Sequence, residues 1–518
     1  MDYNSLMNAV KTSLQATLIS VAVVGAMLFG AAPVAAYTPP SNDDAAWLYK
    51  PSTVAMVDLQ LPQSSIDALW ADARTYVPGT FRLTSGSRSF GPWAVEVRLK
   101  GRWGSGYGLD GKAAFKIKFP NSRQRVGGMK KLTLNNMVQD GSYITETISY
   151  ELFRGMGVPA PRTGYAVVTL NGLDYGLHLN VETPDDRMFS KWFPNEETKH
   201  LYEGSYGCCY NWQDPYSDEH FDVDEGDRAD RSDLAALLNT LSLEGLAWRK
   251  AMEKIADLRA LTAMWAVELY VGHWDGYAWT VNNYFIHNTK RNRITMHPWG
   301  LDQTLGASGP LPFSGPGWGN LLDRCLTDVV CSGYFSEAVL ATRDKARALA
   351  LDERTMTVFA AISPYIEADT RGYGLASATW WRDRTVEFLQ NRPSHVDEWY
   401  LPVSSPVNLA VSPGAPGAAS AHLSWGAPEL AGGVVSGGYL IQYKRLRDRT
   451  WKALEILDPS VTSARVSGLA SGRYEFKVST ISSRGTSTAT KVVPAWLSPA
   501  RRGGHFISSA PTSPVGRR

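Results

Sequence analysis

The chain contains 518 residues, of which 44% are apolar and 20% are charged. Its 52 basic and 50 acidic residues leave a formal net charge of +2, which excludes a strong overall field that would draw the protein to nucleic acid or to an anionic membrane. The length exceeds what a single hydrophobic core usually serves, so two or three domains are expected.

The N-terminus has the features of a signal peptide over residues 1–36. Lys11 precedes an apolar run over residues 18–29, and small residues follow up to Ala36. This order predicts export with cleavage after Ala36. An uncleaved membrane anchor is the alternative, because Asp2 offsets the positive charge of Lys11. We expect a secreted, extracellular or cell-envelope protein with no membrane span after cleavage of the signal peptide.

Four cysteines make an even number, which favours disulfide bonds in an exported chain. Cys325 and Cys331 could close a short loop, whereas the adjacent Cys208 and Cys209 could reach a partner elsewhere, including that same loop. A zinc site is the less favoured alternative, because an adjacent pair lacks the two-residue spacer that is usual between metal thiolates.

The part of the chain before residue 181 is predicted to be rich in strands. Two segments with alternating apolar and polar residues flank a glycine-rich stretch, which predicts a hairpin with a long connection. The dipeptide Asn171-Gly172 predicts a second, tight hairpin. Apolar residues at helical spacing predict a helix between the two hairpins. The predicted strands are residues 54–59, 94–100, 113–119, 166–170 and 175–181, and the predicted helix is 144–153.

Helices dominate the following part of the chain. Apolar residues recur at helical spacing over residues 233–270, with Asp257 as a predicted N-cap, and this spacing returns over residues 336–389. Two short strands are predicted between these regions, at residues 284–286 and 293–296. A β-rich part followed by a helical part predicts a bilobal α+β domain.

This first domain is expected over residues 45–400, and a boundary rich in Pro, Ser and Gly follows at 401–416. The next segments are short predicted strands separated by turns: 406–409, 423–425, 439–443, 466–469 and 474–478. They resemble a fibronectin type III domain over residues 405–495, which implies an all-β sandwich with Trp425 in its core. Residues 496–518 are predicted to be a disordered tail.

A cluster of carboxylates and amides lies between residues 273 and 302. The chain has no G-x-S-x-G, H-E-x-x-H or Walker A motif. Asp275 instead follows a predicted helix, Asn282 and Asn283 open a strand, and Asp302 follows the next strand. Metal-assisted phosphoryl transfer requires such a set, in which one carboxylate orients the acceptor hydroxyl while the amide and the other carboxylate hold Mg²⁺.

These motifs, in this order, resemble the CotH kinase family. Members of the family carry an Asp-containing loop, an N-Y-Y-x-Y-like strand and a W-D-x-D-x-x-x-G-like turn, and this chain has Asp275, residues 283–287 and residues 299–306. The resemblance extends upstream to residues 97–101, 112–119, 131–136, Asp140, 171–172 and 175–176. The resemblance implies an atypical protein-kinase-like fold. It also implies phosphorylation of Ser or Thr in a protein substrate outside the cytosol, with ATP and Mg²⁺.

The resemblance also implies roles for particular residues. Asp275 resembles the catalytic carboxylate, and Asn283 and Asp302 resemble metal ligands. The lysine that faces the phosphates is left open among three candidates in the stretch 112–119, and Glu146 on the following helix could hold one of them. Arg102 could replace an arginine that family members often place near the end of the preceding loop. The three candidate lysines are Lys112, Lys116 and Lys118, of which Lys116 is preferred.

Two features depart from well-known patterns. Gly300 stands where family members often have the first Asp of W-D-x-D, which leaves Asp302 as the single carboxylate of that turn. The acidic run at residues 222–227 resembles a Ca²⁺ loop in composition, but its glycine comes one place too early for an EF-hand. A solvated loop is therefore predicted for the acidic run.

Three functions are compatible with these features. The first is an exported CotH-like protein kinase. The second is a catalytically inactive surface-binding or adhesion protein that keeps the kinase-like fold, which Gly300 favours. The third is a carbohydrate-active enzyme, because fibronectin-like modules accompany secreted polysaccharide hydrolases and paired carboxylates can cleave glycosides. No ordered motif supports the third function.

Overall fold

The computed structural model describes residues 43–204, 212, 220–307, 309–313, 319–399, 404–414, 420–428, 436–448, 451–482, 485–487 and 489–497. The chain divides into two compact units, Met1–Tyr400 and Leu401–Arg518. The predicted signal peptide and the Cys208-Cys209 pair lie outside the described residues. The described residues contain no helix that is both long enough and apolar enough to cross a bilayer.

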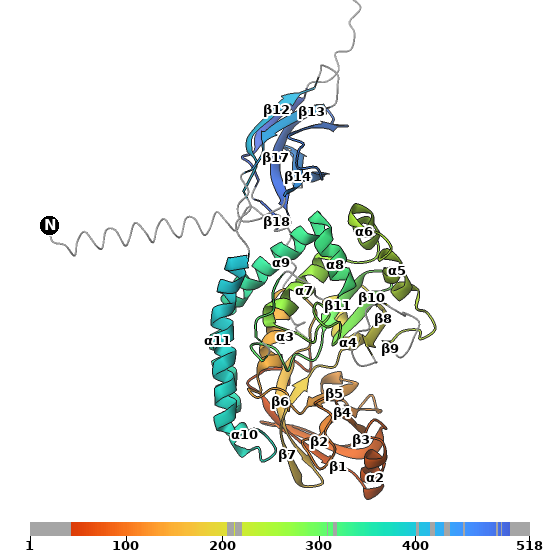
Figure 1. Ribbon diagram of the computed structural model, residues 1–518. Coiled ribbons are helices and arrows are strands. Elements are labelled where there is room, and N and C mark those ends of the chain that lie inside the picture. The colour runs from red at the N-terminus through yellow and green to blue at the C-terminus, as the bar shows by residue number, and fades with distance from the viewer. Residues whose placement is uncertain are drawn as a thin grey trace, which may run out of the picture. The chain divides into compact units, whose positions relative to one another are not determined.

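The first lobe of the first unit is a closed barrel with the strand order β1-β2-β3-β4-β5-β7-β6 (Figure 1). Strands β1 and β6 close it by parallel pairing, whereas the other neighbours are antiparallel. The elements are β1 (Val54–Gln60), α2 (Gln63–Ala71), β2 (Val77–Ser85), β3 (Arg88–Lys100), β4 (Ala114–Lys118), the short 3₁₀ helix η1 (Val126–Gly128), β5 (Lys131–Asn135), α3 (Thr145–Gly155), β6 (Thr163–Leu170) and β7 (Leu173–Val181).

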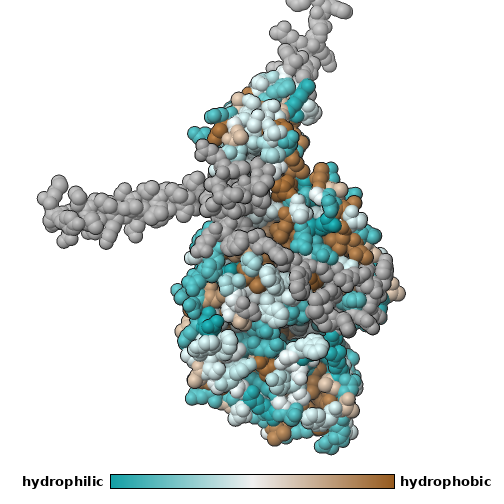
Figure 2. All heavy atoms as spheres, in the orientation of Figure 1, coloured by the Kyte–Doolittle hydropathy of each residue, from teal (hydrophilic) through white to brown (hydrophobic). Residues whose placement is uncertain are grey.

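Alternating side chains fill the interior of the barrel. In β3 and β4, for example, Val97, Phe115 and Ile117 are fully buried, and they belong to one hydrophobic cluster with residues of β1, β2 and β6. The visible outer face of this lobe is mainly hydrophilic or neutral, with scattered hydrophobic side chains (Figure 2). The barrel therefore has its own core, and polar residues remain for its outer surface.

The second lobe combines the antiparallel sheet β11-β10-β8-β9 with helices. Helix α7 is buried at most positions, begins at the N-cap Asp257 as predicted, and ends at Gly272 in the left-handed conformation. The elements are α4 (Asp186–Trp192), β8 (Thr198–Gly204), β9 (Phe221–Glu225), α5 (Ser232–Thr240), α6 (Gly245–Met252), α7 (Leu258–Val271), β10 (Tyr284–Thr289), β11 (Ile294–Pro298), α8 (Asn320–Thr327), α9 (Val329–Ala348), α10 (Leu351–Ala368) and α11 (Leu375–Trp399).

Two features of the second lobe bear on the predictions. Cys325 and Cys331 form a disulfide between α8 and α9, so the short-loop pairing is confirmed. The acidic run was predicted to be a solvated loop, but Phe221–Glu225 is strand β9, which pairs with β8. Loop composition was misleading because Asp222 and Asp224 alternate with the buried Phe221 and Val223.

The second unit is a β-sandwich. One sheet has the order β12-β13-β16, and the other contains β15, β14, β17, β18 and β19. Trp425 is buried against Tyr439, with 5.1 Å between the ring centroids. Trp496 and Leu497, the first residues of the predicted tail, end strand β19. The strands are β12 (Val407–Pro413), β13 (Ser420–Gly426), β14 (Ser436–Arg445), β15 (Lys452–Ile456), β16 (Ser463–Ser467), β17 (Gly472–Ser482), β18 (Gly485–Thr486) and β19 (Val493–Leu497).

The predicted fold class, a bilobal α+β domain followed by an all-β sandwich, is confirmed.

Candidate active site

A cavity of about 480 Å³ is lined by residues from both lobes of the first unit. The barrel contributes residues of β3, β4, β5 and the β3–β4 loop (residues 101–113), and the second lobe contributes residues 275–303 and parts of β8 and β9. The predicted site residues that line it are Arg102, Lys116, Asp275, Asn283 and Asp302. Residues far apart in the sequence thus meet in one cleft.

Asp275 is held by the loop that follows α7. Its Oδ1 accepts hydrogen bonds from Asn282 Nδ2 at 3.0 Å and from Thr280 Oγ1 at 3.2 Å, and its Oδ2 accepts one from Asn283 Nδ2 at 2.7 Å. Burial raises the pKa of Asp275, and the hydrogen bonds from Asn282 and Thr280 oppose that rise. Because the amide nitrogen of Asn283 is committed to Asp275, its oxygen Oδ1 is the atom available as a metal ligand.

Two buried residues, Glu268 and His273, hold the loop that carries Asp275. Glu268 on α7 accepts hydrogen bonds from the backbone N–H groups of Tyr277 at 3.1 Å and Ala278 at 2.8 Å. Burial raises the pKa of Glu268 to about 8. Burial also lowers the pKa of His273 to about 4, so its ring is neutral at physiological pH, and its Nε2 lies 3.1 Å from the carbonyl oxygen of Trp299. The conformation of the Asp275 loop is therefore set by buried groups.

Asp302 lies in the turn after β11, next to the N-terminus of α3. Thr145 Oγ1 lies 3.0 Å from the backbone carbonyl oxygen of Asp302 and 2.8 Å from Asp140 Oδ2, and its one hydroxyl hydrogen serves these two acceptors. Burial raises the pKa of Asp302 to about 6, the charge of Asp140 adds to this rise, and the charge of Lys100 opposes it. Asp140 also accepts hydrogen bonds from the N–H groups of Ser142 and Thr145, so it orders the turn that leads into α3 and pairs with the N–H of the first residue of that helix.

Lys100 also lines the cleft and is connected to the carboxyl group of Glu146 through Asn135. It was not among the lysines predicted from the sequence. Its Nζ lies 2.5 Å from Asn135 Oδ1, and Asn135 Nδ2 donates to Glu146 Oε2 at 2.8 Å. Burial lowers the pKa of Lys100, and the charges of Glu146 and Asp302 oppose this. Burial raises the pKa of Glu146 to about 8, and the charge of Asp302 adds to this rise. Glu146 was predicted to hold Lys112, Lys116 or Lys118, but its hydrogen bond is to Asn135, which in turn contacts Lys100 on β3.

The three lysines predicted to face the phosphates have different positions. Lys116 lines the cleft. Lys112 does not: its Nζ forms a buried ion pair with Asp369 at 2.5 Å, so its assignment to the phosphates is corrected. Lys118 is also corrected, because it is exposed and pairs with Glu96 at 2.8 Å. Alternation along β4 separated Lys116 from the core, but it could not show which lysine the second lobe approaches.

The β3–β4 loop contributes Arg102 to the cleft through a tight backbone turn. The carbonyl of Arg102 accepts a hydrogen bond from the N–H of Gly106 at 2.8 Å. Gly101 has φ +102°, and a Cβ there would lie 2.5 Å from the carbonyl oxygen of Ser105. The turn therefore needs glycine at position 101.

Three further carboxylates line the cleft and were not predicted: Glu203 on β8, and Asp222 and Asp224 on β9. Burial raises the pKa of Glu203, and the charges of Lys116 and Lys100 oppose this. The period-two alternation of residues 221–225 was the sequence signal that could have placed Asp222 and Asp224 on one face of a strand.

The local structure explains why position 300 is a glycine. Its φ is +57°, and a Cβ at this position would lie 2.8 Å from Asn283 Nδ2. A residue with a side chain would therefore push Asn283 away from its present position. The loss of one carboxylate in this turn accompanies a close approach of Asn283.

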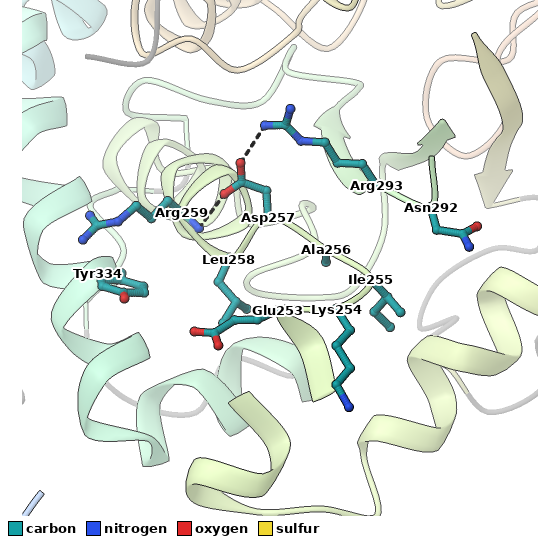
Figure 3. A pocket seen from close by; sticks show the side chains of 10 residues that line it. All are labelled: Glu253, Lys254, Ile255, Ala256, Asp257, Leu258, Arg259, Asn292, Arg293 and Tyr334. Carbon is teal, nitrogen blue, oxygen red and sulfur yellow. Dashed lines mark hydrogen bonds and ion pairs between the residues drawn. The ribbon is translucent and has the colours of Figure 1, made fainter. Parts of the chain in front are cut away.

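A second cavity, of about 460 Å³, lies at the start of α7 and is shown in Figure 3. Asp257 accepts a hydrogen bond from the N–H of Arg259 at 3.1 Å and forms an ion pair with Arg293 at 2.7 Å. Arg259 pairs in turn with Glu337 at 3.0 Å. These charges serve the helix cap and surface ion pairs, so the cavity lacks the converging catalytic groups of the cleft.

The fold and the cleft define a two-lobed, protein-kinase-like domain joined to a β-sandwich. Residues 97–396 match the family described as CotH kinase protein, and residues 404–496 match the fibronectin type III domain. The first match spans more than half of the chain, so the chain belongs to the CotH kinase protein family.

Individual relatives match shorter parts of the chain. An inner spore coat protein H-like protein of Bacillus subtilis (strain 168) is 30% identical over 105 residues, which are 18% of this chain and 33% of the relative. The chain thus spans about a third of the length of that curated relative. Solved structures include the FN1-FN3 domains of chicken CNTN1, with 18% identity over 19% of this chain and 33% of that chain and a TM-score of 0.17. They also include one titled "Myokine structure", with 26% identity over 19% of this chain and 99% of that chain and a TM-score of 0.16.

Proposed function

We propose that this chain is an exported, atypical protein kinase that transfers the γ-phosphate of ATP to Ser or Thr of an extracellular or cell-envelope protein. The observation that carries the proposal is the pairing of two groups across one cleft. Lys100, linked through Asn135 to Glu146, comes from the barrel lobe, and Asp275, Asn283 and Asp302 come from the second lobe. Family membership and the signal-peptide pattern of residues 1–36 support the proposal.

The carboxylates and amide of the cleft fit Mg²⁺ held against phosphates. Within the residues that the structure describes, no three His, Cys, Asp or Glu side chains gather as a ready-made metal site. Mg²⁺ usually binds one or two carboxylates and takes its other oxygens from water and substrate phosphates, so Asp302 and Asn283 Oδ1 are a suitable protein contribution. Bound there, Mg²⁺ would neutralise charge on the phosphate oxygens.

The residues of this chain would then divide the work of phosphoryl transfer. Lys100 and Lys116 donate hydrogen bonds to phosphate oxygens from the barrel side. Asp275 orients the acceptor hydroxyl and takes its proton as the bond from that oxygen to the γ-phosphorus forms and the bond to the leaving ADP breaks. The hydrogen bonds to Asp275 from Asn282 and Asn283 hold its carboxylate in one orientation for this step.

The test is to measure ATP binding by calorimetry with and without Mg²⁺, and phosphoryl transfer from radiolabelled ATP to the chain itself and to a panel of Ser/Thr-containing proteins. We expect Asp302→Asn to abolish the Mg²⁺-dependent part of ATP binding. We expect Asp275→Asn to retain binding but to slow transfer by about 10²–10⁴-fold, the usual contribution of a positioned acid or base. An unmodified chain that binds no ATP with Mg²⁺ present would overturn the proposal.

The second candidate is a catalytically inactive surface-binding or adhesion protein, and Gly300 is the observation that favours it. The turn that carries Asp302 has one carboxylate fewer than the family pattern, and Asn283 lies against the glycine. ATP binding by the unmodified chain without transfer to any protein of the panel would support this alternative.

A further inference from the structure

The corner between α10 and α11 (residues 369–374, the α10–α11 corner) belongs to the second lobe in sequence but contacts the barrel. Asp369 Oδ2 lies 2.5 Å from Lys112 Nζ and accepts a hydrogen bond from the N–H of Leu177 on β7 at 3.0 Å. The side chains of Lys112 and Asp369 are 3% and 0% exposed. Figure 1 shows α11 along the side of both lobes and α10 beside β7, which it contacts. The corner thus reaches the root of the β3–β4 loop.

Arg371 adds a second attachment to the same loop. Its Nη1 donates to the carbonyl of Gly111, and its Nε donates to the carbonyl of Asp174 at 2.8 Å. The guanidinium lies over the ring of Tyr175, 4.1 Å from its centroid, and the hydroxyl of Tyr175 donates to the carbonyl of Leu109 at 2.6 Å. The second half of the β3–β4 loop is therefore fastened at residues 109, 111 and 112.

The first half of the same loop lines the cleft through Gly101, Arg102, Trp103 and Ser105. Asn136 connects the two halves, because its Nδ2 donates to the carbonyl of Ser105 at 3.0 Å and to the carbonyl of Lys112 at 2.7 Å. A continuous series of contacts runs from the corner to the cleft wall. The loop contains five glycines, so without such attachments its backbone would sample many conformations.

The barrel provides space for the corner at Gly176. This residue has φ +77°, and a Cβ there would overlap Asp369 Oδ1. A buried ion pair of this kind adds little net stability, because desolvation of both charges offsets their attraction, whereas it does fix the relative position of its two partners. The contact of Asp369 with Lys112 is therefore better explained by placement of the loop than by stability.

We propose that Asp369 and Arg371 are positioning residues. They hold the β3–β4 loop in the position in which Gly101, Arg102 and Ser105 contact the phosphates of ATP. This inference rests on the proposed function. Because the attachment orders the loop before ATP binds, binding does not carry the entropic cost of ordering it. A loop without the attachment would therefore bind ATP more weakly.

The experiment compares Arg371→Ala and Asp369→Asn with Tyr373→Phe in the full chain. Tyr373 lies in the same corner, but its hydroxyl donates to the carbonyl of Val138, which is outside the loop, so Tyr373→Phe is the matched control. Hydrogen–deuterium exchange of residues 101–113 reports the loop, and calorimetry with Mg²⁺ reports the dissociation constant for ATP. Arg371 is partly exposed, so its variant is expected to fold even where Asp369→Asn does not.

We expect Arg371→Ala to raise loop exchange and the ATP dissociation constant each by about tenfold, the effect of losing one charge-assisted hydrogen bond, while Tyr373→Phe changes neither. Unchanged loop exchange in Arg371→Ala would overturn the attachment. Faster exchange with unchanged ATP affinity would overturn the positioning role. If the unmodified chain binds no ATP, the proposed function and the positioning role both fail, and loop exchange still decides whether the corner fastens the loop.

Discussion

Replacing Lys100 with methionine removes the cation that Asn135 links to Glu146 and keeps an unbranched side chain of similar length. A hydrogen bond between charged groups contributes about 1.5–3 kcal/mol, which corresponds to an ATP dissociation constant weakened by about 10- to 150-fold. The fold should tolerate the change. Burial raises the pKa of Glu146 to about 8, so the carboxyl group can remain protonated at pH 7 and leaves no unpaired buried charge.

The assay is calorimetric titration of the full chain with ATP and Mg²⁺, beside thermal unfolding. Lys118→Met is the matched control, because Lys118 is exposed, pairs with Glu96 and lies outside the cleft, so its affinity for ATP should not change. Equal affinities for Lys100→Met and the unmodified chain would refute the role of Lys100. An equal loss of ATP affinity in both variants would mean that only the total positive charge matters, and not the position of Lys100 in the cleft.

Three further predictions concern a buried ion pair, the turn at Gly300 and a buried carboxyl group. Lys112→Met leaves Asp369 buried without its cation and should lower the free energy of unfolding in urea by about 3–5 kcal/mol; no loss would refute the buried pair. Gly300→Asp adds the family carboxylate, yet it should weaken Mg²⁺-dependent ATP binding in calorimetry because its Cβ displaces Asn283; stronger binding would contradict this. The pKa of Glu268 is raised from 4.5 to about 8, so the folded state favours its protonated form and the free energy of unfolding falls as pH rises through this window. Glu268→Gln should remove that part of the decline, as urea unfolding at pH 5 and pH 8 would show.

Local sequence signals were sufficient to predict several structural elements. Asn171-Gly172 joins β6 to β7 in a tight hairpin, as predicted, because the two central turn positions need positive φ, and both residues have it. Asp257 caps α7, because its side chain can accept hydrogen bonds from the next N–H groups. The cleft also gathers Asp275 and Asp302, which motif order alone had associated.

Contacts between residues far apart in the chain could not be predicted from such local signals. Nothing near Lys112 indicates that its partner is Asp369, since the two residues are 257 positions apart. Lys100 was missed because alternation distinguishes the two faces of a strand but does not show which end of it meets the second lobe. Asp222 and Asp224 were assigned to a loop because their charges suggested one, although they alternate with the apolar Phe221 and Val223.

The order in which the barrel strands are synthesised constrains how the protein folds. Strand β1 opens the described fold, but its parallel partner β6 lies more than a hundred residues later, with Val54 opposite Tyr165. The first strand must therefore wait, with one edge unpaired, until β6 has been made, and such late, non-local pairing slows folding. The attachment of Lys112 to Asp369 comes later still. The β3–β4 loop, which lines the cleft, would thus reach its final position only after α10 and α11 have packed against the barrel.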